Sequence, residues 1–160
     1  MAIQRTNVMR ILDQKKIPYE AHSYPHGDAP VDGVTVSHLI GKPVEQVYKT
    51  LVAVGASKKN YVFVIPVAQE LDLKKAAKAV GEKSISMLPV QNLLPLTGYV
   101  RGGCSPIGMK KQFPTYIHCD ETMPETIIVS AGKIGVQVEL NPEQLMKLIN
   151  ARTANITTEE

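Results

Sequence analysis

Hydrophobic residues alternate with polar ones, or form short apolar runs, in about seven or eight separate stretches of the chain. Residues 47–54 and 61–67 are rich in β-branched and aromatic side chains, and residues 55–60 between them predict a hairpin. The run at 61–67 is apolar on both faces, so we expect a central strand that is covered on both sides. Further strands are predicted over residues 19–24, 84–90, 116–119, 126–130 and 134–140.

Helix signals are fewer and lie mostly towards the two ends of the chain. Three helices have recognisable capping residues. One or two helical turns are expected at 36–40, and one turn at 91–96, closed by Pro95. The final T-T-E-E is predicted to be frayed. The caps are Thr6 for the first helix, Asp72 and Gly81 for the second, and Asn141 followed by Pro142 for the third.

Strands follow strands in this order, without a regular alternation of strand and helix. The pattern predicts an α+β fold in a single domain over residues 1–160, with a mostly antiparallel or mixed, β-barrel-like sheet and flanking helices. A chain of 160 residues is long enough to bury a core of its own.

The composition indicates the compartment of the protein and the kinds of partner it can have. No apolar run approaches the ~20 residues of a membrane span, and the first residues have no apolar signal segment. The two cysteines, Cys104 and Cys119, do not form a disulfide framework, so we predict a cytoplasmic protein with no membrane partner. The net charge of +3 permits an anionic partner without requiring one.

The segment G-Y-V-R-G-G-C-S-P-I-G-M-K-K at 98–111 has four glycines in fourteen residues. Pro106 stiffens this glycine loop, and glycines leave backbone N–H groups bare, so the loop can hold an anion or a polarised carbonyl. The alternative is a plain turn between two strands. Cys104 and Ser105 are candidate nucleophiles in the loop, but neither has an identifiable base in the sequence, and each can instead be a small residue filling a tight turn.

Lys49 is a charged residue within the apolar strand at 47–54. It either guards the edge of a sheet or faces a cavity, where its ammonium can bind a phosphate or carboxylate. The four histidines are scattered, and the two nearest, His22 and His26, have Pro25 between them and Gly27 directly after them. The sequence therefore predicts no metal site, and no cofactor motif is present.

Four motifs together are similar to the YbaK/EbsC family of aminoacyl-tRNA deacylases, which is related to the editing domain of prolyl-tRNA synthetases. The resemblance runs over nearly the whole chain, and it implies a central, mostly antiparallel β-barrel with flanking helices. The motifs are V-Y-K-T-L-V at 47–52, I-P-V-A-Q-E-L-D-L-K-K-A-A at 65–77, the glycine loop at 98–111, and S-A-G-K-I-G at 130–135.

The resemblance implies a hydrolase that cleaves the ester between a wrong amino acid and tRNA, with Cys-tRNA(Pro), and also Cys-tRNA(Cys), as leading substrates. The family's essential lysine falls on Lys49, and its G-x-x-x-P loop falls on 102–106. No cofactor or metal is implied. The candidate substrate-binding residues are Gly102, Gly103, Cys104, Ser105, Pro106, Tyr99, Ser130, Gly132 and Gln137.

The chain departs from some relatives in the early loop, which reads A-P-V-D-G-V at 29–34, and at Gln137, where an aspartate is frequent. Both positions are implied to face the aminoacyl pocket, so alanine or another small amino acid on tRNA is an alternative substrate. A non-catalytic module that binds tRNA or a synthetase is a second alternative. For a cysteinyl substrate, the resemblance implies attack by the substrate's own thiol. The implied partners are aminoacyl-tRNA, tRNA(Pro) and prolyl-tRNA synthetase.

Overall fold

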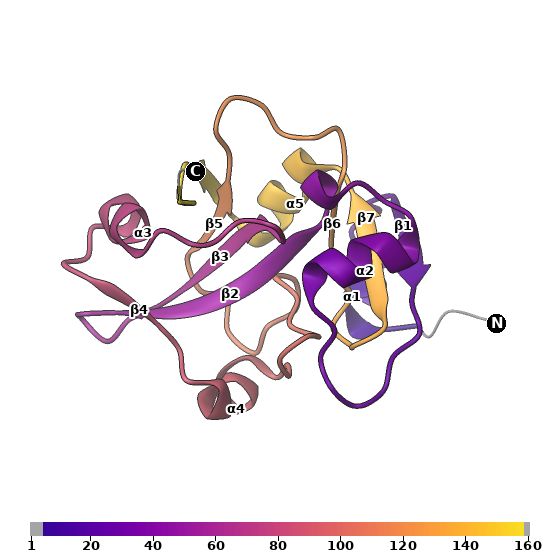
Figure 1. Ribbon diagram of the computed structural model, residues 1–160, viewed down its shortest axis with the longest axis horizontal. Helices are drawn as coiled ribbons and strands as arrows, with labels where there is room; N and C mark the ends of the chain where they lie inside the picture. Colours follow the sequence, from indigo (N-terminus) through magenta and orange to yellow (C-terminus); the bar gives the residue numbers. More distant parts are fainter. Residues whose placement is uncertain (1–4, 159–160) are drawn as a thin grey trace.

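The computed structural model describes residues 5–158, which form two β-sheets with helices around them (Figure 1). The strands are β1 Tyr19–Ser23, β2 Tyr48–Gly55, β3 Asn60–Pro66, β4 Ile85–Met87, β5 Thr115–His118, β6 Ile127–Ser130, β7 Val136–Leu140 and β8 Arg152–Ala154. The α-helices are α1 Asn7–Gln14, α2 Gly33–Ile40, α3 Leu73–Val80, α4 Leu93–Thr97 and α5 Pro142–Ile149, with short 3₁₀ helices η1 Val44–Gln46 and η2 Val90–Asn92.

The two sheets are open and are joined at one point. The first has the order β1-β7-β6 and is antiparallel; the second has the order β4-β2-β3-β5-β8, with β5 parallel to both of its neighbours. A single parallel bridge between Val47 and Ile128 links them. The predicted α+β class and mixed sheet are confirmed. Across residues 5–158 the two sheets do not close into a continuous barrel: beyond that single bridge, no strand of one sheet pairs with a strand of the other.

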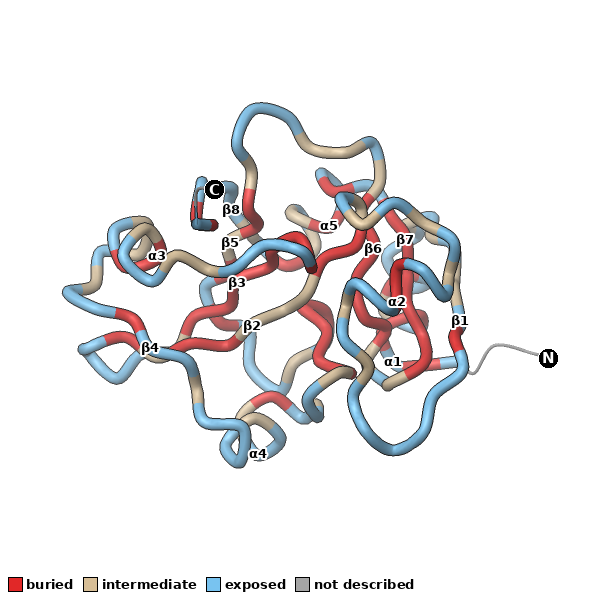
Figure 2. The backbone as a smooth tube through the Cα atoms, viewed as in Figure 1, coloured by how far each residue is buried: buried red, intermediate tan, exposed pale blue. Residues whose placement is uncertain are grey.

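The core occupies both faces of the β2–β3 hairpin (Figure 2). Because side chains alternate along a strand, Val62 and Val64 of β3 enter the larger cluster beside α1 and α5, while Phe63 and Ile65 enter a second cluster beneath α3. The predicted central strand at 61–67 is therefore covered on both faces.

All three predicted capping sites are confirmed. The Thr6 side chain accepts a hydrogen bond from the Met9 N–H, Asp72 accepts from two N–H groups of α3, and Asn141 accepts from the Gln144 N–H. Gly81 ends α3 with φ of 78°.

Three predicted boundaries need correction. Asp32 caps α2 by accepting from the Thr35 N–H, so that helix begins at Gly33 rather than at residue 36. The strand predicted over 84–90 is only β4, because Pro89 starts η2. Pro95 lies inside α4 instead of closing it, since the first turn of a helix has no use for its N–H; Gly98 ends the helix.

The C-terminal residues are ordered where fraying was predicted. The sequence analysis missed β8, which pairs with β5, and Ile156 behind it is fully buried. Thr157 is buried and pairs with Leu71, and the Thr158 N–H donates to the Glu70 carbonyl at 3.0 Å, so the prediction is wrong for these two residues. The last two residues of the predicted frayed tail, 159 and 160, lie outside the described residues.

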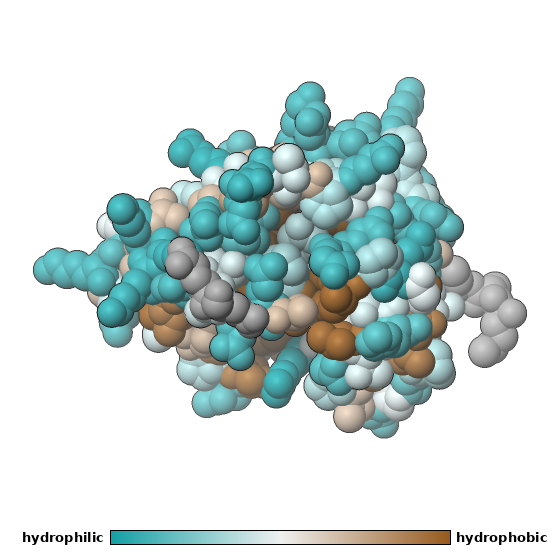
Figure 3. All heavy atoms as spheres, turned by 45° about the horizontal axis from the view of Figure 1, so that its top comes forward, coloured by the Kyte–Doolittle hydropathy of each residue, from teal (hydrophilic) through white to brown (hydrophobic). Residues whose placement is uncertain are grey.

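The surface drawn in Figure 3 is mainly hydrophilic, with a few small hydrophobic areas. Between residues 5 and 158, no helix is both long enough and apolar enough to cross a bilayer.

His118 forms a hydrogen bond with this C-terminal segment, and we expect it to make the stability of the fold depend on pH. The ring is 4% exposed, and its Nδ1 accepts the Ile156 N–H at 3.1 Å, so the proton of the neutral ring sits on Nε2. Burial lowers the pKa of His118 below its ordinary 6.5, against the opposing pull of Asp120.

Because the unfolded chain takes up a proton near pH 6.5 and the folded chain does so only at lower pH, we expect the unfolding free energy to fall as pH drops below about 6.5. Melting temperatures at about pH 7.5 and about pH 5 should therefore differ more for the wild type than for His118→Asn. An unchanged difference in the variant would show that His118 does not carry this dependence.

Candidate functional site

A small cavity of about 100 Å³ lies where β2 separates from β6, and α2, which Figure 1 draws in front of β7, forms one of its walls. Its apolar lining comes from Val31, Val36, Val47, Val67 and Cys104. Its polar lining comes from the other lining side chains, Tyr24, Tyr48, Lys49, Thr50, Ser130 and Gln137, and two glycines, Gly33 and Gly102, complete the wall.

The cavity brings together half of the residues proposed from the sequence. Lys49, Gly102, Cys104, Ser130 and Gln137 all line it, although they come from three distant parts of the chain. The other candidates, Gly103, Ser105, Pro106, Tyr99 and Gly132, do not line it.

Lys49 is half-buried at the start of β2, where it pairs with Ile65 of β3. Its ammonium has no hydrogen bond or ion pair with any residue of the described range. Burial lowers the pKa of Lys49, and the carboxylate of Glu70 opposes that shift. A partly dehydrated cation without a close partner is suited to receive an anionic group in the cavity.

Two polar atoms of the lining lack hydrogen-bond partners among the residues that the structure describes. They are Oγ1 of Thr50 and Oε1 of Gln137, and both are buried. Leaving such an atom unpaired costs about 1–3 kcal/mol, so the pair points to a ligand that carries hydrogen-bond donors. Sequence reasoning missed Thr50, because successive side chains of a strand point to opposite faces and Lys49 therefore does not mark its neighbour.

The glycine loop is held by direct backbone packing. Gly102 has φ of 87°, and a Cβ there would lie 2.7 Å from Cβ of Pro30. A Cβ on Gly103 would lie 3.0 Å from the backbone nitrogen of Ile134, in the turn that follows Ser130. Glycine at these positions therefore lets the loop approach both neighbouring segments.

The backbone of this loop presents free donors. The Gly103 N–H donates to the Val100 carbonyl at 3.0 Å. The N–H groups of Gly102 and Cys104, by contrast, have no partner within residues 5–158. Because Gly102 and Cys104 both line the cavity, their N–H groups are candidates to hold a carbonyl oxygen.

Other residues of the loop have internal partners. The Ser105 hydroxyl oxygen accepts the Ile107 N–H at 3.2 Å, and the Tyr99 hydroxyl donates to the Ile107 carbonyl at 2.6 Å. Burial raises the pKa of the Cys104 thiol to about 12, so the thiol stays neutral at physiological pH. Gly132 is packed against the Tyr99 ring. These contacts explain the loop's shape and offer no activated nucleophile.

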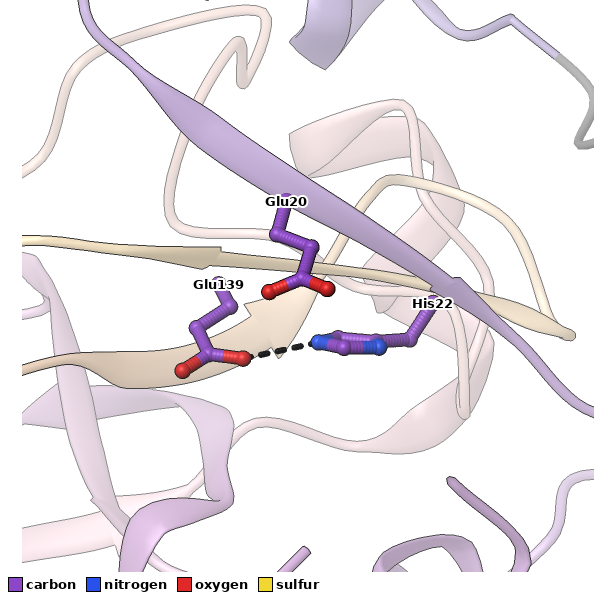
Figure 4. Close-up of side chains that lie close together, drawn as sticks. All are labelled: Glu20, His22 and Glu139. Carbon is purple, nitrogen blue, oxygen red and sulfur yellow. Dashed lines mark hydrogen bonds and ion pairs between the residues drawn. The ribbon is translucent and has the colours of Figure 1, made fainter. Parts of the chain in front are cut away.

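One group of side chains in the described range is close enough to be tested as a metal site. Glu20, His22 and Glu139 place one ligand atom each within 4.8 Å of the others (Figure 4). The group lies outside the cavity, and sequence reasoning missed it, because its members are far apart in the chain.

At the junction of the two open sheets of this α+β fold, the structure thus places a small cavity lined by a lysine, two glycine-loop residues with free N–H groups and two unpaired polar atoms. The chain belongs to the aminoacyl-tRNA editing domain family, whose model matches residues 32–148.

One relative supports membership of this family, and two solved structures share the fold. The relative, "Putative Cys-tRNA(Pro)/Cys-tRNA(Cys) deacylase EbsC" of Enterococcus faecalis, is 48% identical over 98% of this chain and 96% of its own. A solved structure described as a putative trans-editing enzyme for prolyl tRNA synthetase matches with a TM-score of 0.81 and 22% identity, over 98% of this chain and 100% of that one. The hypothetical protein APE2540 shares the fold, with a TM-score of 0.83 and 18% identity over 94% and 99% of the two chains.

Proposed function

We propose that the protein is a free-standing aminoacyl-tRNA deacylase that removes cysteine from Cys-tRNA(Pro), and also from Cys-tRNA(Cys). The observation that carries this proposal is the cavity itself: it combines the unpaired Lys49 ammonium with unpaired oxygens on Thr50 and Gln137 in a volume of about 100 Å³. Such a space suits the aminoacyl group of a small amino acid. The proposed partners are aminoacyl-tRNA, tRNA(Pro) and prolyl-tRNA synthetase.

Each polar group of the cavity has a role in this proposal. The oxygens of Thr50 and Gln137 accept hydrogen bonds from the α-ammonium of the aminoacyl group, which satisfies both of them at once. The free N–H groups of Gly102 and Cys104 hold the ester carbonyl oxygen, where negative charge develops. Lys49 binds the phosphate-bearing 3′ end of the tRNA or stabilises that developing charge.

The nucleophile comes from the substrate. The thiol sulfur of the cysteinyl group attacks its own carbonyl carbon, the S–C bond forms, and the C–O bond to the ribose breaks. The thiol proton passes to the departing ribose oxygen, and water then opens the resulting thiolactone to free cysteine. Holding the thiol beside the carbonyl makes the step intramolecular, and well-oriented reactions of that kind reach effective molarities on the order of 10⁵ M or more.

Gln137 favours keeping alanine as a second candidate substrate. Gln137 is a neutral amide at the position where the family resemblance implies an aspartate in some relatives, and its Oε1 is unpaired in the cavity. An uncharged acceptor holds an α-ammonium less strongly than a carboxylate does, so selectivity then depends more on the apolar wall.

The test is a deacylation assay on tRNA(Pro) charged separately with cysteine, alanine and proline. Faster release of cysteine than of alanine supports the leading substrate, and the reverse order supports the alternative. Binding of charged tRNA with no hydrolysis of any ester would favour a non-catalytic module.

A further inference from the structure

A buried carboxylate on β7 ties the wall of the cavity to the sheet. Glu139 is 9% exposed, accepts three hydrogen bonds and forms one ion pair. On Oε1 it receives His22 Nε2 at 2.8 Å and Lys42 Nζ at 3.3 Å, and on Oε2 it receives Gln46 Nε2 at 2.9 Å and Thr126 Oγ1 at 2.6 Å. Figure 4 shows the His22 contact.

These four donors occupy the acceptor sites of the Glu139 carboxylate. An ionised carboxylate offers about four acceptor sites, so no lone pair of Glu139 remains for a metal ion. A cation beside Oε1 would also meet the Lys42 ammonium, which already balances the charge of Glu139. The group Glu20, His22 and Glu139 is therefore part of a hydrogen-bonded centre rather than a metal site.

The hydrogen bonds outweigh the cost of burial. Burial alone would raise the pKa of Glu139, but the bonds from Thr126, His22 and Lys42 lower it below its ordinary value. Glu139 is thus held ionised. Because an ionised carboxylate only accepts, His22 must carry its proton on Nε2.

Two of the four donors come from the segment that joins α2, one wall of the cavity, to β2. Lys42 and Gln46 belong to the connection between α2 and β2, which includes η1 and leads through Val47 to Lys49. His22 lies opposite Gln137 in the β1–β7 register, and Glu139 follows Gln137 by two residues on the same face of β7.

A small apolar cluster connects the α2–η1 segment to the wall of the cavity. Val47, Val67 and Ile128 form it, and Ile40 and Val44 from α2 and η1 pack against them. Val47 and Val67 also line the cavity. If the α2–η1 segment moved on the sheet, the side chains of this cluster would move with it, and the apolar lining of the cavity would change shape.

We propose that Glu139, through Lys42 and Gln46, acts as a positioning residue that fixes the α2–η1 wall and so sets which aminoacyl side chains the cavity accepts. The inference rests on the proposed deacylase function. Lys49 itself is held by the β2–β3 ladder, so loosening the wall changes selectivity more than it changes the reaction.

The test compares the kcat/KM of the full chain for a cysteinyl-tRNA ester with that for a bulkier leucyl-tRNA ester. This ratio does not depend on how much of a variant is folded, so a purely structural loss leaves it unchanged. We expect Lys42→Met and Glu139→Gln each to lower the ratio by about tenfold, because a displaced wall no longer excludes the larger side chain.

Two further variants sharpen the test. Lys42→Arg keeps a cation beside Glu139 and should restore the wild-type ratio. Glu20→Gln removes a charge from the same group without removing any hydrogen bond to Glu139, and should leave the ratio unchanged. A wild-type ratio in Lys42→Met and Glu139→Gln would overturn the positioning role. If the wild type cleaves neither the cysteinyl nor the leucyl ester, that result counts against the proposed function and not against the positioning role.

Discussion

Replacing Lys49 with methionine is expected to lower the deacylation rate by about 10²-fold or more while leaving the fold intact. The ammonium is half-buried, lines the cavity, and has no close partner in the described part of the chain. Since burial already lowers the pKa of Lys49, the charge is held at some cost, and its removal should not reduce the melting temperature. Initial rates on Cys-tRNA(Pro) and a thermal melt measure the two effects.

Lys78→Met is the matched control for this prediction. Lys78 is an exposed lysine of α3 and does not line the cavity, so its replacement removes the same charge without touching the site. Near-normal hydrolysis by a folded Lys49→Met variant would reduce Lys49 to a charge that guards a strand edge.

The second large effect concerns the nucleophile. We expect the double variant Cys104→Ala, Cys119→Ala to keep most of its activity, because burial keeps the Cys104 thiol neutral and no hydrogen bond joins either thiol to a histidine or a carboxylate in the structure described. The substrate's own thiol should matter far more. The seryl ester of the same tRNA, with a hydroxyl in place of that thiol, should be cleaved more slowly by about 10²-fold or more.

Each half of that prediction has its own contradicting result. A covalent acyl-enzyme trapped on either protein cysteine would replace the substrate-assisted route with protein nucleophilic catalysis. Equal rates on the seryl and cysteinyl esters would favour an activated water. An acyl-enzyme on Cys104 or equal ester rates would leave the cavity as the site, whereas an acyl-enzyme on Cys119, which does not line the cavity, would place the chemistry elsewhere.

Local signals in the sequence predicted local structure well. Thr6, Asp72 and Asn141 cap helices because each cap depends on residues within the following turn. Strand alternation likewise placed the covered strand β3. The family motifs pointed to Lys49 and Gly102, which line one cavity in the structure.

Features that depend on distant parts of the chain were not predictable in this way. Whether the sheets close depends on pairing between distant strands, and only a single bridge between Val47 and Ile128 joins the two sheets in the described residues. Strand β8 likewise forms because β5 offers it an edge. The unpaired Thr50 hydroxyl and the four donors around Glu139 become visible only when side chains from different strands are placed together.

Whether the cavity around Lys49 receives the aminoacyl group is tested most directly by a release assay. The rate at which amino acid is released from tRNA(Pro) charged with cysteine or with proline is measured for the wild type and for Lys49→Met. We predict rapid release of cysteine by the wild type, slow release of proline, and spontaneous rates for both esters with the variant. Release of cysteine at the spontaneous rate by the folded wild type, or equal release by wild type and variant, would contradict the account.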